Sequence, residues 1–189
     1  MVPDDVFDAT VFVSGILGAT ARIQSMDIRS IASWTNEMFH QVTEAVLRFD
    51  GVPVKFMGDG FLCFFAGQDH QSRGVRAAIG ARESVTDPLV IGLSSGETHL
   101  ATIGHPSYAR PDILGPTVNR AVRVLGWVQS NAKSRIGASV ETLVNLNGSY
   151  DLGGKIEVQL KGFAEPVTIQ EILGLGFVQK VDGTRDLPS

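Results

Sequence analysis

Cysteine is almost absent from this chain, which has one, Cys63, among 189 residues. A single thiol cannot form a disulfide within the chain, so the composition fits a protein that works in the reducing cytoplasm. Cys63 lies in the apolar run of residues 61–65, where a small buried hydrophobic side chain is the simplest interpretation. We therefore expect a cytoplasmic protein in which Cys63 is neither a nucleophile nor a metal ligand.

Long apolar runs and an excess of positive charge are lacking as well. No run approaches the roughly 20 apolar residues that a membrane-spanning helix needs. The N-terminus, Met-Val-Pro-Asp-Asp, lacks the positive flank of a signal peptide. The formal net charge is −4, whereas a protein that binds nucleic acid or a membrane surface in general carries a basic face. We expect no nucleic acid partner and no membrane segment, although a local basic pocket for phosphate is compatible with this charge.

The hydrophobic pattern predicts one α+β domain at residues 9–175, after a lead-in at 1–8 and before a loose polar tail at 176–189. Strands are predicted at 10–14, 52–57, 61–65, 89–94, 97–103, 136–139, 156–160 and 167–173. Helices are predicted within 21–49, 75–82, 118–128 and 140–146, and a loop or arm at 104–115. This order predicts a ferredoxin-like βαββαβ core with extra C-terminal strands and with the helices on one face of the sheet.

Two glycine-containing turns carry candidate metal and phosphate ligands. Asp59 lies at the tip of the hairpin turn Gly58-Asp59-Gly60, where its carboxylate projects outward and can bind a metal ion. The same tripeptide is a good tight turn whatever the aspartate does. Residues 15–20, including Gly18, form a turn into a helix with Thr20 as its expected cap. Such a turn presents backbone amides to a phosphate group.

Polar and charged side chains in three further places could hold the rest of a nucleotide. Asn119 and Arg123 are four residues apart on a predicted helix and therefore project from the same face. Lys55 and Asp112 offer one donor and one acceptor, which match the ring nitrogen and the exocyclic amine of adenine. Lys161 is a candidate for the terminal phosphate. Each of these also has a plain structural explanation as a solvated side chain, so their weight lies in the combination.

In combination, these motifs resemble the class III nucleotidyl cyclase catalytic domain of the adenylate and guanylate cyclase family. The resemblance covers residues 9–173. The matching pieces are Thr10-Val-Phe-Val-Ser-Gly-Ile-Leu-Gly-Ala-Thr20, Val54-Lys-Phe-Met-Gly-Asp-Gly60, Gly92-Leu-Ser-Ser-Gly-Glu97, the stretch from Asp112 to Arg123, and Leu160-Lys-Gly-Phe-Ala-Glu-Pro166. The pattern Gly-x-x-Val-Asn-x-Ala-x-Arg within the fourth piece is the most specific of them.

The resemblance implies the class III cyclase catalytic fold and a nucleotide site at a dimer interface. Domains of this family pair head to tail, here as a homodimer or as a heterodimer with another cyclase domain. One subunit supplies two aspartates for Mg²⁺ or Mn²⁺, and the other supplies the groups that hold the base, the ribose and the phosphates. The 3′-hydroxyl of the substrate attacks the α-phosphate and pyrophosphate leaves. The substrate expected here is ATP and the product cyclic AMP.

The family's roles can be carried over to matching positions of this chain. Asp59 would be a metal ligand, Lys55 with Asp112 would recognise adenine, and Lys161, Gly18 and Thr20 would contact the triphosphate. The resemblance also implies that Asn119 orients the ribose and that Arg123 stabilises the transition state.

One position departs from the family's pattern. Gly15 stands where the second metal aspartate belongs, and Ala19 stands where an aromatic residue usually precedes Thr20. Asp8 lies seven residues before Gly15, on the order of 20 Å along an extended strand, and is a poor substitute. Glu97 belongs to another predicted strand and is not placed by the sequence. We therefore expect impaired metal binding.

Three hypotheses follow from this combination. The first is an adenylate cyclase weakened by Gly15. The second is a degenerate cyclase that binds nucleotide or a partner chain without turnover, and that could serve in a heterodimer whose other chain brings both metal aspartates. The third is an unrelated ferredoxin-like domain, which five matching motifs disfavour.

Overall fold

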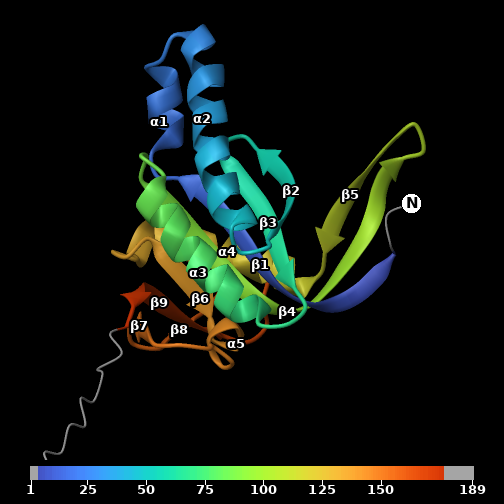
Figure 1. Cartoon of the computed structure of the whole chain (residues 1–189), viewed down its shortest axis with the longest axis vertical. Helices are drawn as coiled ribbons and strands as arrows, with labels where there is room; N and C mark the ends of the chain where they lie inside the picture. Colours follow the sequence, from blue (N-terminus) through green and yellow to red (C-terminus); the bar gives the residue numbers. More distant parts are fainter. Residues whose placement is uncertain (1–3, 177–189) are drawn as a thin grey trace, which may run out of the picture.

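The computed structural model describes residues 4–176, so most of the predicted tail, residues 177–189, lies outside the described residues. Its elements are β1 (Asp5–Ile16), α1 (Ala19–Gln24), α2 (Ile28–Leu47), β2 (Val52–Met57), β3 (Gly60–Ala66), α3 (His70–Ser84), β4 (Leu89–His105), β5 (Tyr108–Leu114), α4 (Pro116–Asn131), β6 (Ile136–Ser139), α5 (Val140–Leu143), β7 (Tyr150–Leu152), β8 (Ile156–Val158) and β9 (Val167–Leu175). Figure 1 shows a central twisted sheet with helices packed against it and the β4–β5 hairpin projecting to one side.

The sheet has nine strands, and seven of them follow the order β2-β3-β1-β4-β6-β9-β7. β5 pairs with β4, and β8 pairs with β9. The first four strands of this order, with α1–α2 after β1 and α3 after β3, form the βαββαβ core that the sequence predicted. β4 and β6 run parallel, whereas every other described pair is antiparallel. The predicted α+β class with added C-terminal strands is therefore confirmed.

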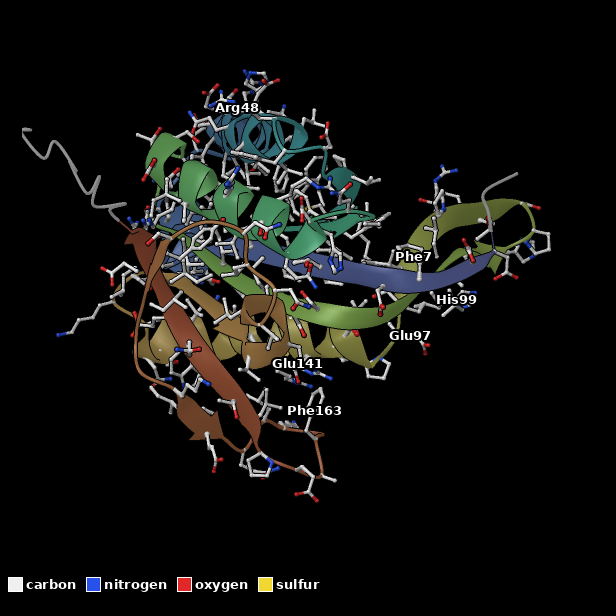
Figure 2. The ribbon with its side chains drawn as sticks, turned by 60° about the horizontal axis from the view of Figure 1, so that its bottom comes forward. Phe7, Arg48, Glu97, His99, Glu141 and Phe163 are labelled. Atoms are coloured by element: carbon white, nitrogen blue, oxygen red, sulfur yellow. The ribbon has the colours of Figure 1, made fainter. Side chains whose placement is uncertain are left out.

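Helices cover both faces of the sheet, which corrects the prediction that they share one face. Figure 2 shows α2 and α3 on one side of β1 and β4, and α4 on the other. Phe12 of β1 packs into the cluster under α2 and α3, whereas Val11 and Val13 pack with Ala121 of α4. A strand buried on both faces reads as a continuous apolar run, and β1 and β3 both have such runs. These continuous apolar runs, in place of alternating apolar and polar residues, indicate that both faces of the sheet are covered.

Several element boundaries also differ from the prediction. The single helix predicted within 21–49 is two helices, because Asp27 has extended backbone angles and its side chain accepts hydrogen bonds from Arg29 N at 3.1 Å and Ser30 N at 3.3 Å. The strand predicted at 10–14 extends to Asp5–Ile16, within part of the expected lead-in, and β7 was not predicted. An aspartate just before a helix is an N-cap signal, and it explains the break between α1 and α2.

The β4–β5 hairpin replaces the two short strands predicted at 89–94 and 97–103 and the loop predicted at 104–115. β4 runs unbroken for 17 residues because β1 pairs with it on both sides of Gly96. Residues 108–114 form β5 on its outer edge, despite Pro111. Proline is tolerated at a sheet edge, where its missing N–H need not face another strand. The consequence for the site is that Asp112 is held in a strand rather than in a loop.

Two glycines set how closely α4 approaches the sheet. A Cβ atom on Gly92 of β4 would lie 2.4 Å from Leu125 N of α4, and one on Gly137 of β6 would lie 2.5 Å from Val128 Cγ2. The helix backbone therefore rests directly on β4, with Ala121 and Val124 buried. This contact fixes which residues of α4 face outward. Among residues 4–176, no helix is both long enough and apolar enough to cross a membrane.

Candidate active site

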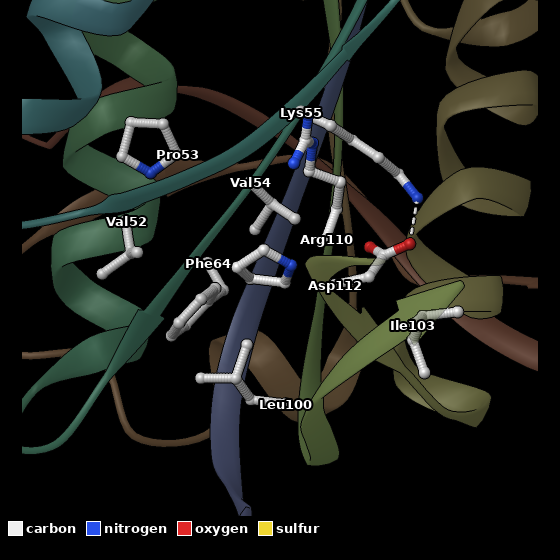
Figure 3. Close-up of a pocket in the computed structure, with 10 residues that line it drawn as sticks. Val52, Pro53, Val54, Lys55, Phe64, Leu100, Ile103, Arg110 and Asp112 are labelled. Carbon is white, nitrogen blue, oxygen red and sulfur yellow. Dashed lines mark hydrogen bonds and ion pairs between the residues drawn. The ribbon is translucent and has the colours of Figure 1, made fainter. Parts of the chain in front are cut away.

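Lys55 of β2 and Asp112 of β5 meet at one end of a pocket between these strands, which we call the β2–β5 pocket. Its volume is about 660 Å³. Lys55 Nζ donates to Asp112 Oδ2 at 2.5 Å, and Figure 3 shows this pair beside the apolar side chains of the pocket. Residues lining the pocket are Val52, Pro53, Val54, Lys55, Phe64, Leu100, Ile103, Arg110, Pro111 and Asp112. The sequence predicted this pairing, although the two residues are far apart in the chain.

The β2–β5 pocket combines apolar walls with a donor and an acceptor at its edge. Asp112 Oδ1 accepts a hydrogen bond from Ile113 N at 2.9 Å, which fixes the carboxylate on its strand. The side chain of Lys55 is 40% exposed and that of Asp112 is 18% exposed, so both can be reached by a ligand. A flat heteroaromatic ring could insert between the apolar walls while its edge pairs with the donor and the acceptor.

Arg110 lines the same pocket and was not singled out from the sequence. It precedes Asp112 by two positions on β5, so the two residues lie on the same face of the strand. Its guanidinium lies 4.8 Å from the ring centre of Tyr108. In a strand, residues two positions apart lie on the same face, which would have linked Arg110 to Asp112. This signal was missed because residues 104–115 were predicted as a loop.

Asn119, Arg123 and Lys161 line a second pocket, the α4 pocket, with a volume of about 470 Å³. Pro116, Gly162, Phe163 and Ala164 complete its lining. Asn119 and Arg123 lie one helical turn apart on the exposed side of α4, opposite the residues that pack on β4. Within the described part of the chain, neither Arg123 nor Lys161 takes part in an ion pair. The pocket therefore presents two cations that an anionic ligand could neutralise.

A tight turn between β8 and β9 places Lys161. Phe163 N donates to Leu160 O at 3.1 Å, and Gly162 takes a positive φ of 90° that other residues rarely adopt. The amide of Gln159 also donates to Phe163 O at 2.7 Å. These bonds fix a loop with an exposed lysine opposite α4. The sequence predicted Lys161 as a phosphate ligand but gave no indication that Phe163 would share its pocket.

Gly15, Asp59 and Gln129 meet at the end of β1, in a cluster that we call the Gly15 corner. Asp59 Oδ2 accepts a hydrogen bond from Ile16 N at 3.1 Å, which ties the β2–β3 turn to β1. A Cβ atom on Gly15 would lie 3.6 Å from Asp59 Oδ2 and 4.0 Å from Gln129 Nε2, in ordinary van der Waals contact. A side chain at position 15 would therefore start beside the Asp59 carboxylate, where a shared metal ion would need it.

Neither Asp8 nor Glu97 lies close enough to Gly15 to supply a carboxylate beside Asp59. Asp8 of β1 lies opposite Glu97 of β4, whereas Gly15 lies opposite Val90. Both carboxylates are therefore seven positions along the sheet from Gly15, about 23 Å at the usual rise of a strand. No group of three or more His, Cys, Asp or Glu side chains within residues 4–176 could hold a metal ion. Asp59 alone fits an ion that is bound largely through substrate phosphates and water, as Mg²⁺ often is.

The turn predicted at 15–20 is shorter than expected, and Thr20 does not cap the helix. Gly15 and Ile16 still belong to β1, and Gly18 with φ 79° is the N-cap of α1, without a side-chain cap. Thr20 lies in the first turn of the helix with its side chain exposed. The amide of Leu17 donates to Pro88 O at 3.0 Å and that of Ile16 to Asp59, so neither is free for phosphate. The phosphate-binding amides of this segment would have to come from α1 itself.

The candidate residues form separate clusters within one chain. The β2–β5 pocket and the α4 pocket share no lining residue, and Asp59 lines neither. Lys55 thus lies with Asp112, and Asn119 and Arg123 lie with Lys161, but these two sets and Asp59 do not line one common pocket.

Comparison with known proteins gives structural matches only. No protein-family model and no curated protein matches the chain. The guanylyl cyclase Cya2 matches with a TM-score of 0.78 and 24% identity, over 94% of this chain and 97% of that one. The adenylyl cyclase CyaB from P. aeruginosa matches with a TM-score of 0.75 and 24% identity, over 98% and 100%. The guanylate cyclase domain of RhGC from Catenaria anguillulae, in complex with GTP, matches with a TM-score of 0.79 and 20% identity, over 91% and 100%.

Proposed function

We propose that this chain, which has the fold of the class III nucleotidyl cyclase catalytic domain, is an adenylate cyclase domain weakened at its metal site. It would convert ATP to 3′,5′-cyclic AMP and pyrophosphate at the interface of two head-to-tail cyclase domains. The observation that carries the choice of ATP is the Lys55–Asp112 pair at the edge of the apolar β2–β5 pocket. Such a pair offers a donor to a ring nitrogen of adenine and an acceptor to its exocyclic amine.

The reaction would be an intramolecular phosphoryl transfer. The 3′-oxygen forms a bond to the α-phosphorus, the bond from that phosphorus to the bridging oxygen breaks, and the hydroxyl proton is released as pyrophosphate leaves. Arg123 would stabilise the charge that develops on the transferring phosphate, and Asn119 would orient the ribose. Lys161 would hold the terminal phosphate, with Gly18 and Thr20 near the triphosphate at the start of α1. Support for these roles comes from the α4 pocket, where Asn119, Arg123 and Lys161 share one cavity.

Asp59 would hold Mg²⁺ or Mn²⁺, which neutralises phosphate charge when bound. The carboxylate is already fixed by Ile16 N. Because Gly15 has no side chain, the site would lack a second carboxylate for the metal ion. This lack should cost several kcal/mol of transition-state stabilisation. At about 1.4 kcal/mol per tenfold change, the rate would fall roughly a hundred- to ten-thousand-fold below that of a site with two aspartates.

Cyclic nucleotide formation from ATP and Mn²⁺, followed by mass spectrometry, tests this proposal. We expect cyclic AMP from the purified chain and at least about a hundredfold less from Arg123→Ala, the loss typical of removing one transition-state donor. Arg48→Ala is a matched control, because Arg48 is an exposed arginine outside both nucleotide pockets. No product from folded protein would point instead to a degenerate cyclase that binds nucleotide or a partner without turnover.

The assignment of the base has a separate test. The double variant Lys55→Glu with Asp112→Cys removes the adenine donor and acceptor, so ATP binding should weaken relative to GTP binding. Competition against a fluorescent nucleotide measures both affinities. The control is the double variant Lys155→Glu with Asp151→Cys, which makes the same substitutions at two exposed positions outside the pocket. It should leave the ratio of ATP affinity to GTP affinity unaltered. An unchanged preference in the first variant contradicts the assignment of ATP.

A further inference from the structure

The Gly15 corner contains a polar side chain that neither the motifs nor the proposed reaction uses. Gln129 comes from the last turns of α4, and its Nε2 atom would lie 4.0 Å from a Cβ atom on Gly15. Asp59 Oδ2 would lie 3.6 Å from the same Cβ atom. The amide of Gln129 and the carboxylate of Asp59 therefore border the space that an aspartate at position 15 would fill.

Packing between α4 and the sheet holds Gln129 at this corner. Gly15 lies opposite Val90 of β4, and Val90 packs in one cluster with Val124 and Val128 of α4. The neighbouring residue Gln129 is thereby carried to the end of β1 on the same side of the sheet. This position follows from buried contacts, so it does not depend on a flexible loop.

The Gln129 amide is free to bind a ligand. Its side chain is exposed and makes no hydrogen bond to another of the described residues 4–176. Rotation by 180° about the last side-chain bond exchanges the amide nitrogen and oxygen, so that Oε1 can face the same space. Amide oxygens are ordinary ligands of hard divalent cations, whereas an amide nitrogen is not.

We propose that Gln129 supplies the second protein oxygen beside Asp59 for a divalent cation, in place of the carboxylate that Gly15 lacks. The inference rests on the proposed role of Asp59 as a metal ligand. A neutral amide contributes coordination without a second negative charge, so the ion should be held more weakly than between two aspartates. The Gly15 corner would thus still bind a divalent cation, with an amide oxygen in place of one carboxylate.

Binding of Mn²⁺ alone to the whole chain, measured from the electron paramagnetic resonance signal of free Mn²⁺, tests this inference without reference to turnover. Gln129→Met keeps the length of the side chain and removes its oxygen, so the affinity should fall about tenfold. Gln129→Glu adds a carboxylate beside Asp59, so the affinity should rise above that of the unaltered chain. Ser130→Ala, a change at the exposed neighbouring position of α4, should leave the affinity unchanged.

Asp59→Asn separates this inference from the one on which it rests. If Asp59→Asn weakens Mn²⁺ binding and both Gln129 variants bind as the unaltered chain does, the role of Gln129 is wrong and that of Asp59 stands. If neither Asp59→Asn nor Gln129→Met changes binding, both assignments are wrong. Circular dichroism of each variant confirms that a lost affinity does not reflect an unfolded chain.

Discussion

At the scale of single residues, Gly15 has the largest expected effect on chemistry. It lies on β1, opposite Val90, and its missing side chain leaves Asp59 as the one carboxylate of the corner. The surroundings remain suited to a side chain, because a Cβ atom would make only ordinary contacts and the backbone lies outside the region of positive φ. Restoring a carboxylate at this position should therefore require little rearrangement.

Gly15→Asp should raise cyclase activity by about a hundredfold or more, since it returns the several kcal/mol of metal-based stabilisation that a second carboxylate provides. The rate of cyclic AMP formation in Mn²⁺ measures this gain. Gly15→Asn has nearly the same size but no charge, and it should gain far less. Folded Gly15→Asp protein with unaltered activity would mean that this residue is not what limits turnover.

The same variant should make stability depend on metal. Without a cation, two carboxylates this close repel each other, and Mn²⁺ binding would remove that repulsion. A ligand that binds only the folded state raises its stability, so Mn²⁺ should raise the melting temperature of Gly15→Asp more than that of Gly15→Asn. An equal response of the two variants would contradict a shared metal at Asp59.

At the scale of elements, α4 connects the packing of the core to the candidate site. Its inner face rests on Gly92 and Gly137, Asn119 and Arg123 lie on its outer face, and Gln129, farther along, lies on the side that borders the end of β1. The helix begins at Gly115-Pro116, where proline in the first turn costs no hydrogen bond. Small shifts of α4 relative to the sheet would therefore move polar side chains in both the α4 pocket and the Gly15 corner.

Gly92→Ala should destabilise the fold, because its Cβ atom would lie 2.4 Å from Leu125 N and backbone must move to accommodate it. We expect a loss of about 2–3 kcal/mol, typical of overpacking a core, measured by urea unfolding. Gly126→Ala is the matched control on α4 itself, where a Cβ atom meets nothing within 4 Å. It should stabilise the chain by about 0.5–1 kcal/mol through helix propensity. Equal changes in the free energy of unfolding for the two variants would contradict the close packing of α4 against β4.

At the scale of the whole molecule, the separation of the candidate clusters is consistent with a site shared between two chains. Asp59 lines neither the β2–β5 pocket nor the α4 pocket. If one chain supplies Asp59 and its partner supplies Arg123, variants at these two positions can complement each other. This property belongs to the assembly and has no counterpart in an isolated chain.

A mixture of Asp59→Asn and Arg123→Ala chains should recover activity that neither variant has alone. Random pairing of equal amounts makes half of the dimers mixed, each with one intact site of two, so about 25% of the unaltered activity is expected for a two-fold symmetric dimer. Cyclic AMP formation after mixing measures the recovery. No recovery, in a mixture shown to exchange subunits, would mean that Asp59 and Arg123 act from the same chain or that one of them is not needed.

Local pattern predicted much of this molecule. The βαββαβ order, the hairpin that presents Asp59 and the helical spacing of Asn119 and Arg123 all depend on residues close together in the chain. Turn chemistry and hydrophobic periodicity act over a few residues, so they can be read without the fold.

Contacts between distant segments were decided by tertiary structure. Pairing with β1 makes β4 one long strand, β5 lines up against its edge, and α4 crosses to the opposite face of the sheet because β1 and β4 are buried on both sides. The meeting of Gln129 with Gly15 has the same origin, since it depends on α4 packing against Val90. The sequence by itself determined which chemical groups the chain carries and that position 15 has no side chain. Only the tertiary structure decided which groups meet, because close packing joins side chains whose separation along the chain carries no signal.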